Sequence, residues 1–330
     1  MDLLAIIGLL IVLYILIYIF ILLIVDCDLG LLWAVYFGKK LRNLQGKVIW
    51  VTGASSGIGE FMAIEFARNG AKIILSARSE TNLERVKGRC LDVGASLDSI
   101  AVFPFDVTNT AKHEAIFQKA IKLFGRLDIL VNNAGRSQRA VWENIDFAVD
   151  KEIFKLNVFS VLSLSRLAVK YFENAGIFGH LVVTSSLAGV FGAPFSSSYN
   201  GSKHAIHGYF NTLRMEKGRD KLAVTLLCPG PVFSNFLSQC FTEKAGEVFG
   251  EEINKTDKRM ETSRCAYLSA VAIVNRLDEV WMAVFPAIPL TYILVYYPNI
   301  TKLITRFIGQ RRIMKIRDSR QTVITENNPR

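Results

Sequence analysis

Cysteine is scarce in this chain of 330 residues, and internal repeats, low-complexity linkers and C-x-x-C pairs are absent. Five cysteines are too few for a disulfide scaffold, and without a C-x-x-C pair neither a zinc ribbon nor a thioredoxin-type site is expected. Charged residues make up 21% of the chain and hydrophobic residues 51%, which excludes disorder as its main state. The length suits a large domain with a buried core. The cysteines are Cys27, Cys90, Cys228, Cys240 and Cys265.

Apolar sequence is in excess near the start of the chain, where no residue from Leu3 to Val25 is charged. At about 1.5 Å of rise per residue, a helix of that length reaches about 35 Å, enough to cross the hydrocarbon core of a membrane. A cleaved signal peptide is disfavoured, because the run is too long, its start carries no Lys or Arg, and no A-x-A site follows. A buried globular helix is disfavoured because every face is apolar. We predict an uncleaved, single-pass anchor over residues 1–28.

Basic residues after this run favour a catalytic domain on the cytosolic side of the membrane. Lys39, Lys40 and Arg42 follow the anchor, whereas only the amino terminus carries positive charge before it. One of three N-x-S/T sequons, at Asn200, falls within the candidate active site described below, where a glycan would obstruct the pocket.

The net charge of +10 is concentrated at the other end of the chain. Residues 302–330 contain eight Lys and Arg against two acidic residues, so this tail supplies +6 of the +10. It is either a solvated, partly disordered tail or a segment that adheres to an anionic leaflet. Nucleic-acid binding is disfavoured, because no recognition motif accompanies the charge. The uncharged stretch Val280–Ile300 is interrupted by three prolines, which disfavours a second membrane span. Residues 285–330 are therefore expected to comprise an apolar membrane-facing segment and the basic tail.

Between residues 46 and 284, short apolar runs alternate with amphipathic stretches. Nearly all-apolar strands alternating with helices are typical of a parallel sheet covered on both faces, so we predict an α/β, doubly wound sheet of Rossmann type with about seven strands. The helical patterns are Ile58–Asn69, Leu83–Leu91, Ala111–Phe124, Phe147–Phe172 and Ser198–Lys217. The expected strands are Val48–Gly53, Lys72–Ser76, Ile100–Phe105, Ile129–Asn132, Leu181–Ser185, Val224–Cys228 and Glu279–Val284.

A glycine-rich loop follows the first expected strand and opens the first helix. Glycines let the backbone approach a pyrophosphate, and the helix N-terminus offers free N–H groups to its charge. An NAD site usually has an Asp or Glu at the end of the second strand, and this chain has neither there. Arg78 occupies that position instead. Its guanidinium would pair with a 2′-phosphate, which favours NADP(H). The alternative is a surface arginine that opens the next helix. The loop residues are Thr52, Gly53, Ala54, Ser55, Ser56, Gly57, Ile58 and Gly59.

Tyr199 and Lys203 stand four apart in a helical pattern, so their side chains share a face. A neighbouring lysine cation favours phenolate and lowers a phenol pKa that is about 10 in water, which would make Tyr199 a general acid/base for hydride transfer. Ser186 follows a strand and could hydrogen-bond the substrate oxygen as charge develops on it.

Taken together, these residues resemble the short-chain dehydrogenase/reductase family over about residues 46–284. The resemblance implies that Asp106 and Val107 hold the adenine, that Asn132–Gly135 support the sheet and line the cofactor, and that Asn157 positions a water that relays protons to Lys203. Lys203 would also bind the nicotinamide ribose, and Val232 would orient the carboxamide. The family often has Thr where this chain has Ser234, and a hydroxyl remains. The remaining residues implied at the cofactor are Asn133, Ala134, Gly135, Pro229 and Gly230.

Within the family, the apolar N-terminus, Leu31–Ala34, Trp50–Glu60, Thr262–Cys265 and Glu279–Trp281 are similar to a membrane-bound subgroup. That similarity implies an enzyme of the endoplasmic reticulum membrane that uses NADPH on lipophilic carbonyls such as steroids and retinoids. The family resemblance also suggests a homo-oligomer.

The predicted function is therefore that of an anchored, NADPH-dependent carbonyl reductase, reversible as an alcohol dehydrogenase, with lipophilic substrates and membrane lipid as its partners. Two alternatives stay open: a 3-keto lipid reductase, and a catalytically silent nucleotide-binding membrane scaffold.

His204 and His207 lack the further ligands that a zinc site needs, so no metal is expected. Residues 238–258 form either a lid over the substrate or a surface insertion. Four aromatic residues could line an apolar pocket or simply pack in the core: Phe191, Phe195, Phe233 and Phe236.

Overall fold

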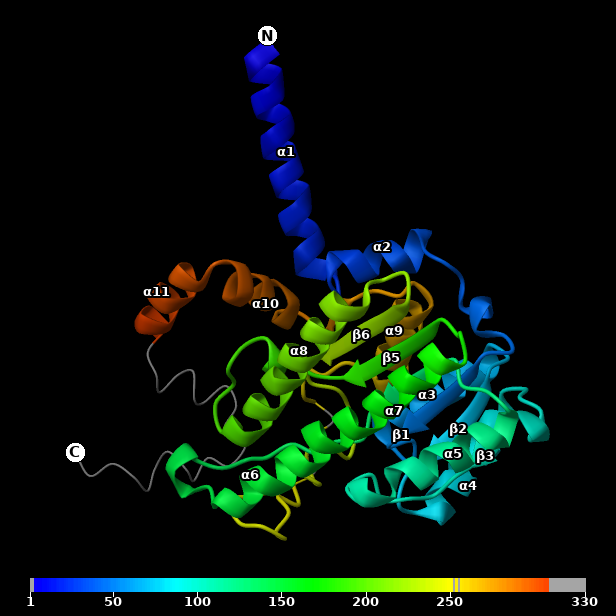
Figure 1. Cartoon of the computed structure of the whole chain (residues 1–330). Helices are drawn as coiled ribbons and strands as arrows, with labels where there is room; N and C mark the ends of the chain where they lie inside the picture. Colours follow the sequence, from blue (N-terminus) through cyan, green and yellow to red (C-terminus); the bar gives the residue numbers. More distant parts are fainter. Residues whose placement is uncertain (1–2, 252, 255, 309–330) are drawn as a thin grey trace.

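A seven-stranded parallel sheet forms the centre of the computed structural model, which describes residues 3–251, 253–254 and 256–308 (Figure 1). The strand order β3-β2-β1-β4-β5-β6-β7 has its switch point between β1 and β4. The prediction of an α/β, doubly wound sheet is confirmed. The strands are β1 (Val48–Thr52), β2 (Lys72–Ser76), β3 (Ile100–Val102), β4 (Ile129–Asn132), β5 (Gly179–Thr184), β6 (Leu222–Pro229) and β7 (Glu279–Met282).

Strand residues point alternately into two hydrophobic cores, one on each face of the sheet. Ile49 and Val51 of β1 pack in the core that includes α2, α3, α4 and α9, whereas Val48 and Trp50 pack in the core that includes α5, α7 and α8. Because both faces are covered, the strands are apolar at nearly every position. The helices are α1 (Leu3–Ile24), α2 (Leu29–Phe37), α3 (Gly57–Arg68), α4 (Glu80–Asp92), α5 (His113–Phe124), α6 (Phe147–Phe154), α7 (Ser160–Asn174), α8 (Ser197–Lys217), α9 (Thr262–Val274), α10 (Ala287–Tyr296) and α11 (Pro298–Ile308).

Several helices differ from the sequence prediction. The single helix expected over residues 147–172 is two helices, α6 and α7, joined by a π-helical turn at Lys155–Phe159. The helices α2, α9, α10 and α11 have no counterpart among the predicted elements. For α9 the reason is burial on nearly all sides, since such a helix has no polar face from which its period can be read.

The first helix, α1, stands clear of the sheet for most of its length (Figure 1). Within the described part of the chain it is the one helix long and apolar enough to cross a membrane. At its end, Leu22 and Val25 enter the hydrophobic core on the α8 face of the sheet. Of the basic tail expected at the C-terminus, residues 309–330 lie outside the described residues.

Candidate active site

A cavity of about 1800 Å³ opens beyond the carboxyl ends of the strands, at the switch point between β1 and β4. This is the edge at which doubly wound sheets bind their ligands. Of the residues predicted at the site, four do not line the cavity: Thr52, Gly59, Asn132 and Asn157. Those that line it are Gly53, Ser55, Ser56, Gly57, Ile58, Arg78, Asp106, Val107, Asn133, Ala134, Gly135, Ser186, Tyr199, Lys203, Pro229, Gly230, Val232 and Ser234.

The glycine-rich loop runs from β1 into the first turn of α3. Gly53 has a φ of +66°, and a Cβ atom there would lie 2.8 Å from Cα of Ala134. The loop can therefore approach the end of β4 only with glycine at this position. Gly57, with a φ of +57°, begins α3, so unpaired N–H groups of the helix face the cavity.

Asn133 joins three neighbouring strands at this edge. Its side-chain Nδ2 donates to the carbonyl oxygens of Thr52 and Gly53 at 3.3 and 3.2 Å, and its Oδ1 accepts from Oγ1 of Thr184 at 3.1 Å. The Thr52 hydroxyl in turn accepts from the backbone N–H groups of Asn133 and Ala134. The ends of β1, β4 and β5 are thereby held together beneath the cavity.

At one end of the cavity, a cation and a carboxylate lie on neighbouring strand ends. Arg78 follows β2 and is exposed, and it forms no ion pair within the described part of the chain. Burial alone would raise the pKa of Asp106, yet hydrogen bonds from Thr108 and the positive charges of Arg78 and Lys155 hold it below its usual value. This end of the cavity can thus receive both an anionic group and hydrogen-bond donors.

The predicted catalytic pair lies in the first two turns of α8. Tyr199 and Lys203 are both buried, and Nζ of Lys203 is 5.7 Å from the centroid of the Tyr199 ring. Nζ also donates to the carbonyl oxygen of Thr184 at 2.7 Å. Burial lowers the pKa of Lys203 to about 8. The ammonium is therefore placed next to the phenol, in an environment where its charge is poorly solvated.

Ser186 lies where β5 ends, on the same side of the cavity as this pair. Its Oγ donates to the carbonyl oxygen of Pro229 at 3.3 Å and accepts from the N–H of Ala188 at 3.2 Å. The latter bond caps the short helical turn Leu187–Gly189 and fixes the position of the hydroxyl.

Asn157 lies in the π-helical turn between α6 and α7, behind the cavity wall. Its Oδ1 accepts from the N–H of Arg136 at 3.0 Å, and its Nδ2 donates to the carbonyl oxygen of Arg136 at 2.8 Å and to Oγ of Ser202 at 3.1 Å. A Cβ atom at Gly135 would lie 3.1 Å from Oδ1 of Asn157 and 3.7 Å from Nζ of Lys203. Asn157 thus connects the end of β4 to α8 within reach of Lys203. A π-turn frequently marks a functional position.

The opposite end of the cavity is largely apolar. Phe236 packs edge to face on the Tyr199 ring, with 5.9 Å between the ring centroids. Phe191 and Phe236 line the cavity, whereas Phe195 and Phe233 do not. The segment 238–258, for which a lid was one interpretation, contributes several lining residues as well. Further lining residues come from α10 and α11: Ala287, Leu290, Ile293, Leu294 and Thr301.

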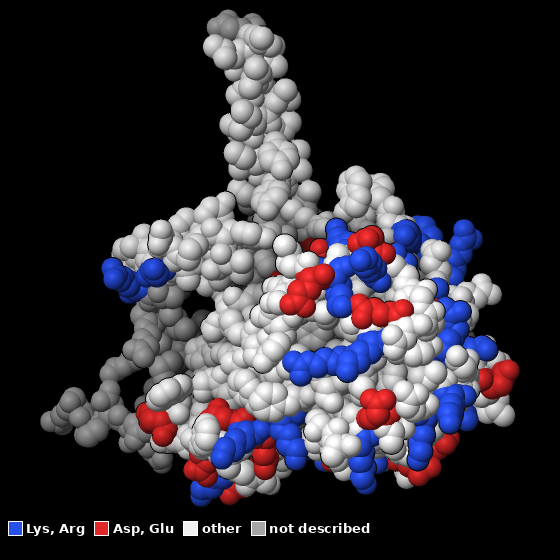
Figure 2. All heavy atoms as spheres, viewed as in Figure 1, with Lys and Arg blue, Asp and Glu red and all other residues white. Residues whose placement is uncertain are grey.

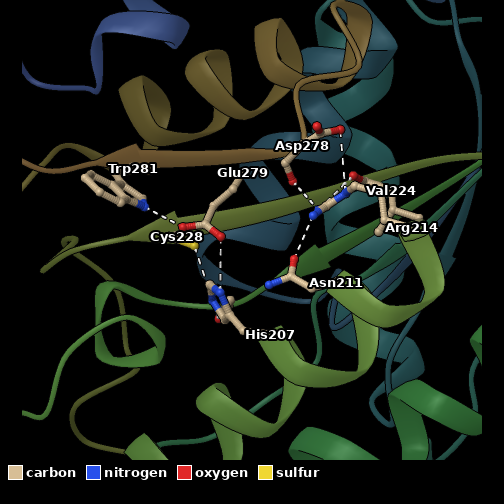
Figure 3. Close-up of polar contacts among 9 residues, drawn as sticks. His207, Asn211, Arg214, Val224, Cys228, Asp278, Glu279 and Trp281 are labelled. Carbon is tan, nitrogen blue, oxygen red and sulfur yellow. Dashed lines mark hydrogen bonds and ion pairs between the residues drawn. The ribbon is translucent and has the colours of Figure 1, made fainter. Parts of the chain in front are cut away.

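Sequence reasoning missed a series of polar contacts that joins His207 of α8 to Glu279 and Trp281 of β7 (Figure 3). Nε2 of His207 is 2.9 Å from Oγ of Ser185, and its Nδ1 is 3.2 Å from Oε2 of Glu279 on β7. Nε1 of Trp281 donates to Oε1 of the same carboxylate at 2.7 Å. Burial would raise the pKa of Glu279, but the hydrogen bonds from His207 and Trp281 hold it below its usual value. A glutamate in an otherwise apolar strand was the available signal.

The two histidines of α8 make different contacts. His204 Nδ1 contacts the carbonyl oxygen of Asn200, whereas His207 is taken up by Ser185 and Glu279. Among the described residues, no group of three or more His, Cys, Asp or Glu side chains is arranged to hold a metal ion.

Comparisons with known proteins show the family of the chain and agree with its fold. The family model for short chain dehydrogenases matches residues 47–245. Dehydrogenase/reductase SDR family member 7 of Mus musculus is 38% identical over 297 residues, 89% of this chain and 87% of that protein. The 11-beta-hydroxysteroid dehydrogenase A of Sesamum indicum is 38% identical over 207 residues, 62% of this chain and 58% of that protein. A solved short chain dehydrogenase/reductase from Burkholderia phymatum, in complex with NAD, is 25% identical with a TM-score of 0.67; the match covers 78% of this chain and 96% of that one.

Proposed function

The chain belongs to the short-chain dehydrogenase/reductase family, and from this premise we propose that it is a membrane-anchored, NADPH-dependent carbonyl reductase, reversible as an alcohol dehydrogenase. The observation that carries the proposal is the placement of Tyr199, Lys203 and Ser186 around one cavity at the nucleotide-binding edge of the sheet. Membership in the family supports oxidation and reduction between an alcohol and a carbonyl as the reaction class.

The residues present fit a nicotinamide dinucleotide. Gly53 and Gly57 both have positive φ at the start of α3, and the close approach of Gly53 to Ala134 leaves no room for a Cβ atom. A pyrophosphate suits the N–H groups of the first turn of α3. Asp106 and Val107 would hold the adenine, Asn133–Gly135 would line the middle of the cofactor, and Lys203 and Val232 would hold its nicotinamide end. When bound, such a cofactor supplies the hydride that reduces the carbonyl carbon.

The chain's own groups would then control the carbonyl oxygen. The Tyr199 hydroxyl donates its proton to that oxygen. The Ser186 hydroxyl, which donates to the carbonyl oxygen of Pro229 in this structure, would turn to donate its hydrogen bond to the substrate oxygen as negative charge develops. The Lys203 ammonium stabilises the phenolate that remains on Tyr199. Asn157, which bonds to the end of β4 and to α8, would position the path by which a proton returns.

Arg78 is the basis for proposing NADP(H) rather than NAD(H). Its guanidinium lines the cavity at the end of β2, where a 2′-phosphate would accept two of its N–H donors. The solved relative from Burkholderia phymatum is in complex with NAD, so membership in the family does not by itself select NADP(H), and the proposal for this chain depends on Arg78.

A lipophilic substrate is supported by the apolar end of the cavity and by one relative's name, which is that of a hydroxysteroid dehydrogenase. We propose a steroid- or retinoid-type carbonyl. The proposed organisation is a membrane anchor over residues 1–28, an NADP(H)-binding reductase domain over 46–284, and an apolar membrane-facing segment with a basic tail over 285–330. The proposed location is the endoplasmic reticulum membrane with the domain on the cytosolic side, and the proposed assembly is a homo-oligomer.

Two alternatives are retained from the sequence. A 3-keto lipid reductase would use the same residues on an acyl substrate, for which the apolar cavity end is equally suited. A silent scaffold would need only the nucleotide end, and the buried Tyr199–Lys203 pair with Ser186 beside it argues against that function.

The test is NADPH oxidation by the detergent-solubilised protein with ketosteroids, retinal, small quinones and a 3-keto acyl thioester, each also measured with Tyr199→Phe. Turnover by the wild type that is lost in the variant supports the reductase and ranks the substrates. NADPH binding without turnover of any carbonyl would favour the scaffold.

A further inference from the structure

The end of α1 is fixed to the domain by an additional pairing with β7. The N–H of Ala283 donates to the carbonyl oxygen of Asp26, and the N–H of Asp28 donates to the carbonyl oxygen of Trp281, both at 2.9 Å. Cys27 lies opposite Met282 in this antiparallel bridge and is fully buried. The residues between α1 and α2 therefore extend the edge of the sheet instead of forming a loose linker.

Side chains fix the same junction from three further elements. Both carboxylate oxygens of Asp26 accept from Arg264 of α9, at 2.8 and 3.0 Å. Asp28 caps α2 by accepting from the N–H of Leu31, and its other oxygen accepts from the N–H of Trp281. The N–H of Leu29 donates to the hydroxyl of Tyr292 on α10. The segment that follows α1 is thereby held to α2, α9, α10 and β7.

The elements beside this junction expose an unusual number of large apolar side chains. In Figure 1, α2 and the α10–α11 segment lie on opposite sides of the end of α1. In the sequence, no acidic residue occurs from Val280 to Arg317, and the charged residues of α11 are Lys302 and Arg306. In Figure 2, the surface over α10 and α11 is white apart from a blue patch. The exposed apolar residues are Trp33, Tyr36 and Phe37 of α2, Leu290 and Tyr296 of α10, Tyr297, and Ile300, Leu303 and Phe307 of α11.

This surface has the composition of a layer in contact with a membrane. Aromatic and aliphatic side chains prefer the boundary between headgroups and acyl chains, and Lys and Arg beside them are attracted by anionic lipid. On α11, Ile300, Leu303 and Phe307 follow helical spacing and lie on one face, while Lys302 and Arg306 lie on another. A helix of this kind lies in the plane of the interface.

The helices α10 and α11 also form a wall of the cavity at its apolar end. Leu290, Ile293 and Leu294 of α10 and Thr301 of α11 line it, together with Phe236, which packs against Tyr199. One layer of helix thus separates the exposed apolar surface from the interior in which the carbonyl would react.

We propose that α2, α10 and α11 rest on the bilayer surface around α1, held there by the Asp26–Asp28 junction, and that lipophilic substrates pass from the lipid into the cavity alongside α10 and α11. The substrate route rests on the proposed function, which supplies the identity of the substrate. The contact of α2, α10 and α11 with lipid does not depend on catalysis. The partner of this surface is a bilayer with anionic lipid.

The first test measures contact with lipid without using activity. The five native cysteines are buried, so a nitroxide can be attached selectively to Leu303→Cys or Phe307→Cys in the full-length protein, in lipid nanodiscs with an anionic fraction. Lys122→Cys on α5 is the control for a surface remote from α10. We expect the labels on α11 to be shielded from a water-soluble relaxation agent and reached by oxygen dissolved in lipid. Labels on α11 as accessible to water as the control, or coupled to a label on a second copy, would overturn the proposal.

The second test measures the substrate route in vesicles. In a double variant, Leu303→Asp with Phe307→Asp, docking should weaken while the cavity lining stays intact, and exposed Leu97→Asp is the matched control. We expect kcat/KM for a membrane-partitioned ketone to fall by about tenfold, and kcat/KM for a water-soluble carbonyl to stay unchanged. An equal fall for both substrates, or none for either, would contradict the route. If the wild type reduces neither substrate, the proposed function fails, and the label measurement still decides the docking.

Discussion

The two ends of the cavity are built in different ways. The nucleotide end is formed by strand ends and the turns that follow them, with glycines at positive φ and with Asn133 bonded across three strands. The apolar end is formed by α10 and α11, whose lining residues are mostly aliphatic, and by Phe236, Leu237, Phe241 and Ile253 of the segment after β6, which also contributes polar residues. The first end requires particular residue types at particular places, and the second requires volume and hydrophobicity. A substitution at the first end should therefore impair one particular function. A substitution at the second end should change substrate affinity in proportion to the apolar contact that is lost.

The largest effect is expected where the two ends meet, at Tyr199. Tyr199→Phe removes the proton donor but keeps the ring that packs against Phe236, so reduction of every carbonyl should fall by about 10²–10⁴-fold. The NADPH dissociation constant, measured by fluorescence titration, should change little. If this variant still reduced one class of substrate, that class would not depend on Tyr199 as its proton donor.

The next effect concerns Lys203 and pH. Its pKa is about 8 in the folded protein and about 10.4 in an unfolded chain, so between these values the unfolded state binds more protons. The free energy of unfolding of the cofactor-free protein should consequently rise with pH from 8 to 10.4, by about 3 kcal/mol from this group. Thermal midpoints of the wild type and Lys203→Met across this range, in detergent, measure the difference. If the thermal midpoints of the two proteins changed with pH in parallel, the Lys203 ammonium would be better solvated than its burial indicates.

A smaller and more selective effect is expected at Arg78, at the far nucleotide end. Arg78→Gln removes the charged donors, and hydrogen bonds to charged groups contribute about 1.5–3 kcal/mol, so preference for NADPH over NADH should fall by about tenfold to hundredfold. The ratio of kcat/KM values for the two cofactors is the readout, with Lys87→Gln on α4 as the control. An unchanged ratio would remove the basis for NADP(H).

The smallest effect is expected at the apolar end. Leu290→Ala shortens a partly exposed side chain on the cavity wall, which should raise KM for a lipophilic ketone by a few fold, since about 1 kcal/mol of apolar contact is lost. The NADPH dissociation constant and KM for a small water-soluble carbonyl should not change. A change in NADPH affinity would mean that the two ends are mechanically coupled.

Particular elements explain how far the sequence could be read. β1, β2 and β4 were located well because buried parallel strands are short apolar runs, and the glycine loop, Arg78 and Ser186 were located by their place at strand ends. The sequence did not predict three other features, because each depends on the residues that pack against it. They are the extent of β3, the π-helical turn at Asn157 and the helix α9. The His207–Glu279 contact joins residues far apart in the chain, and spacing alone gives no sign of it.

By itself, the sequence determined the fold class, the family, the order of the cofactor and catalytic motifs, and the apolar helix at the start. These properties are local: a strand, a turn or a helix start imposes its residue types within a few positions. Only the tertiary structure decided which residues surround Lys203 and lower its pKa, which helices close the apolar end, and how α1 is joined to β7. Those properties depend on burial and on contacts between distant segments, and burial is a property of the folded chain as a whole.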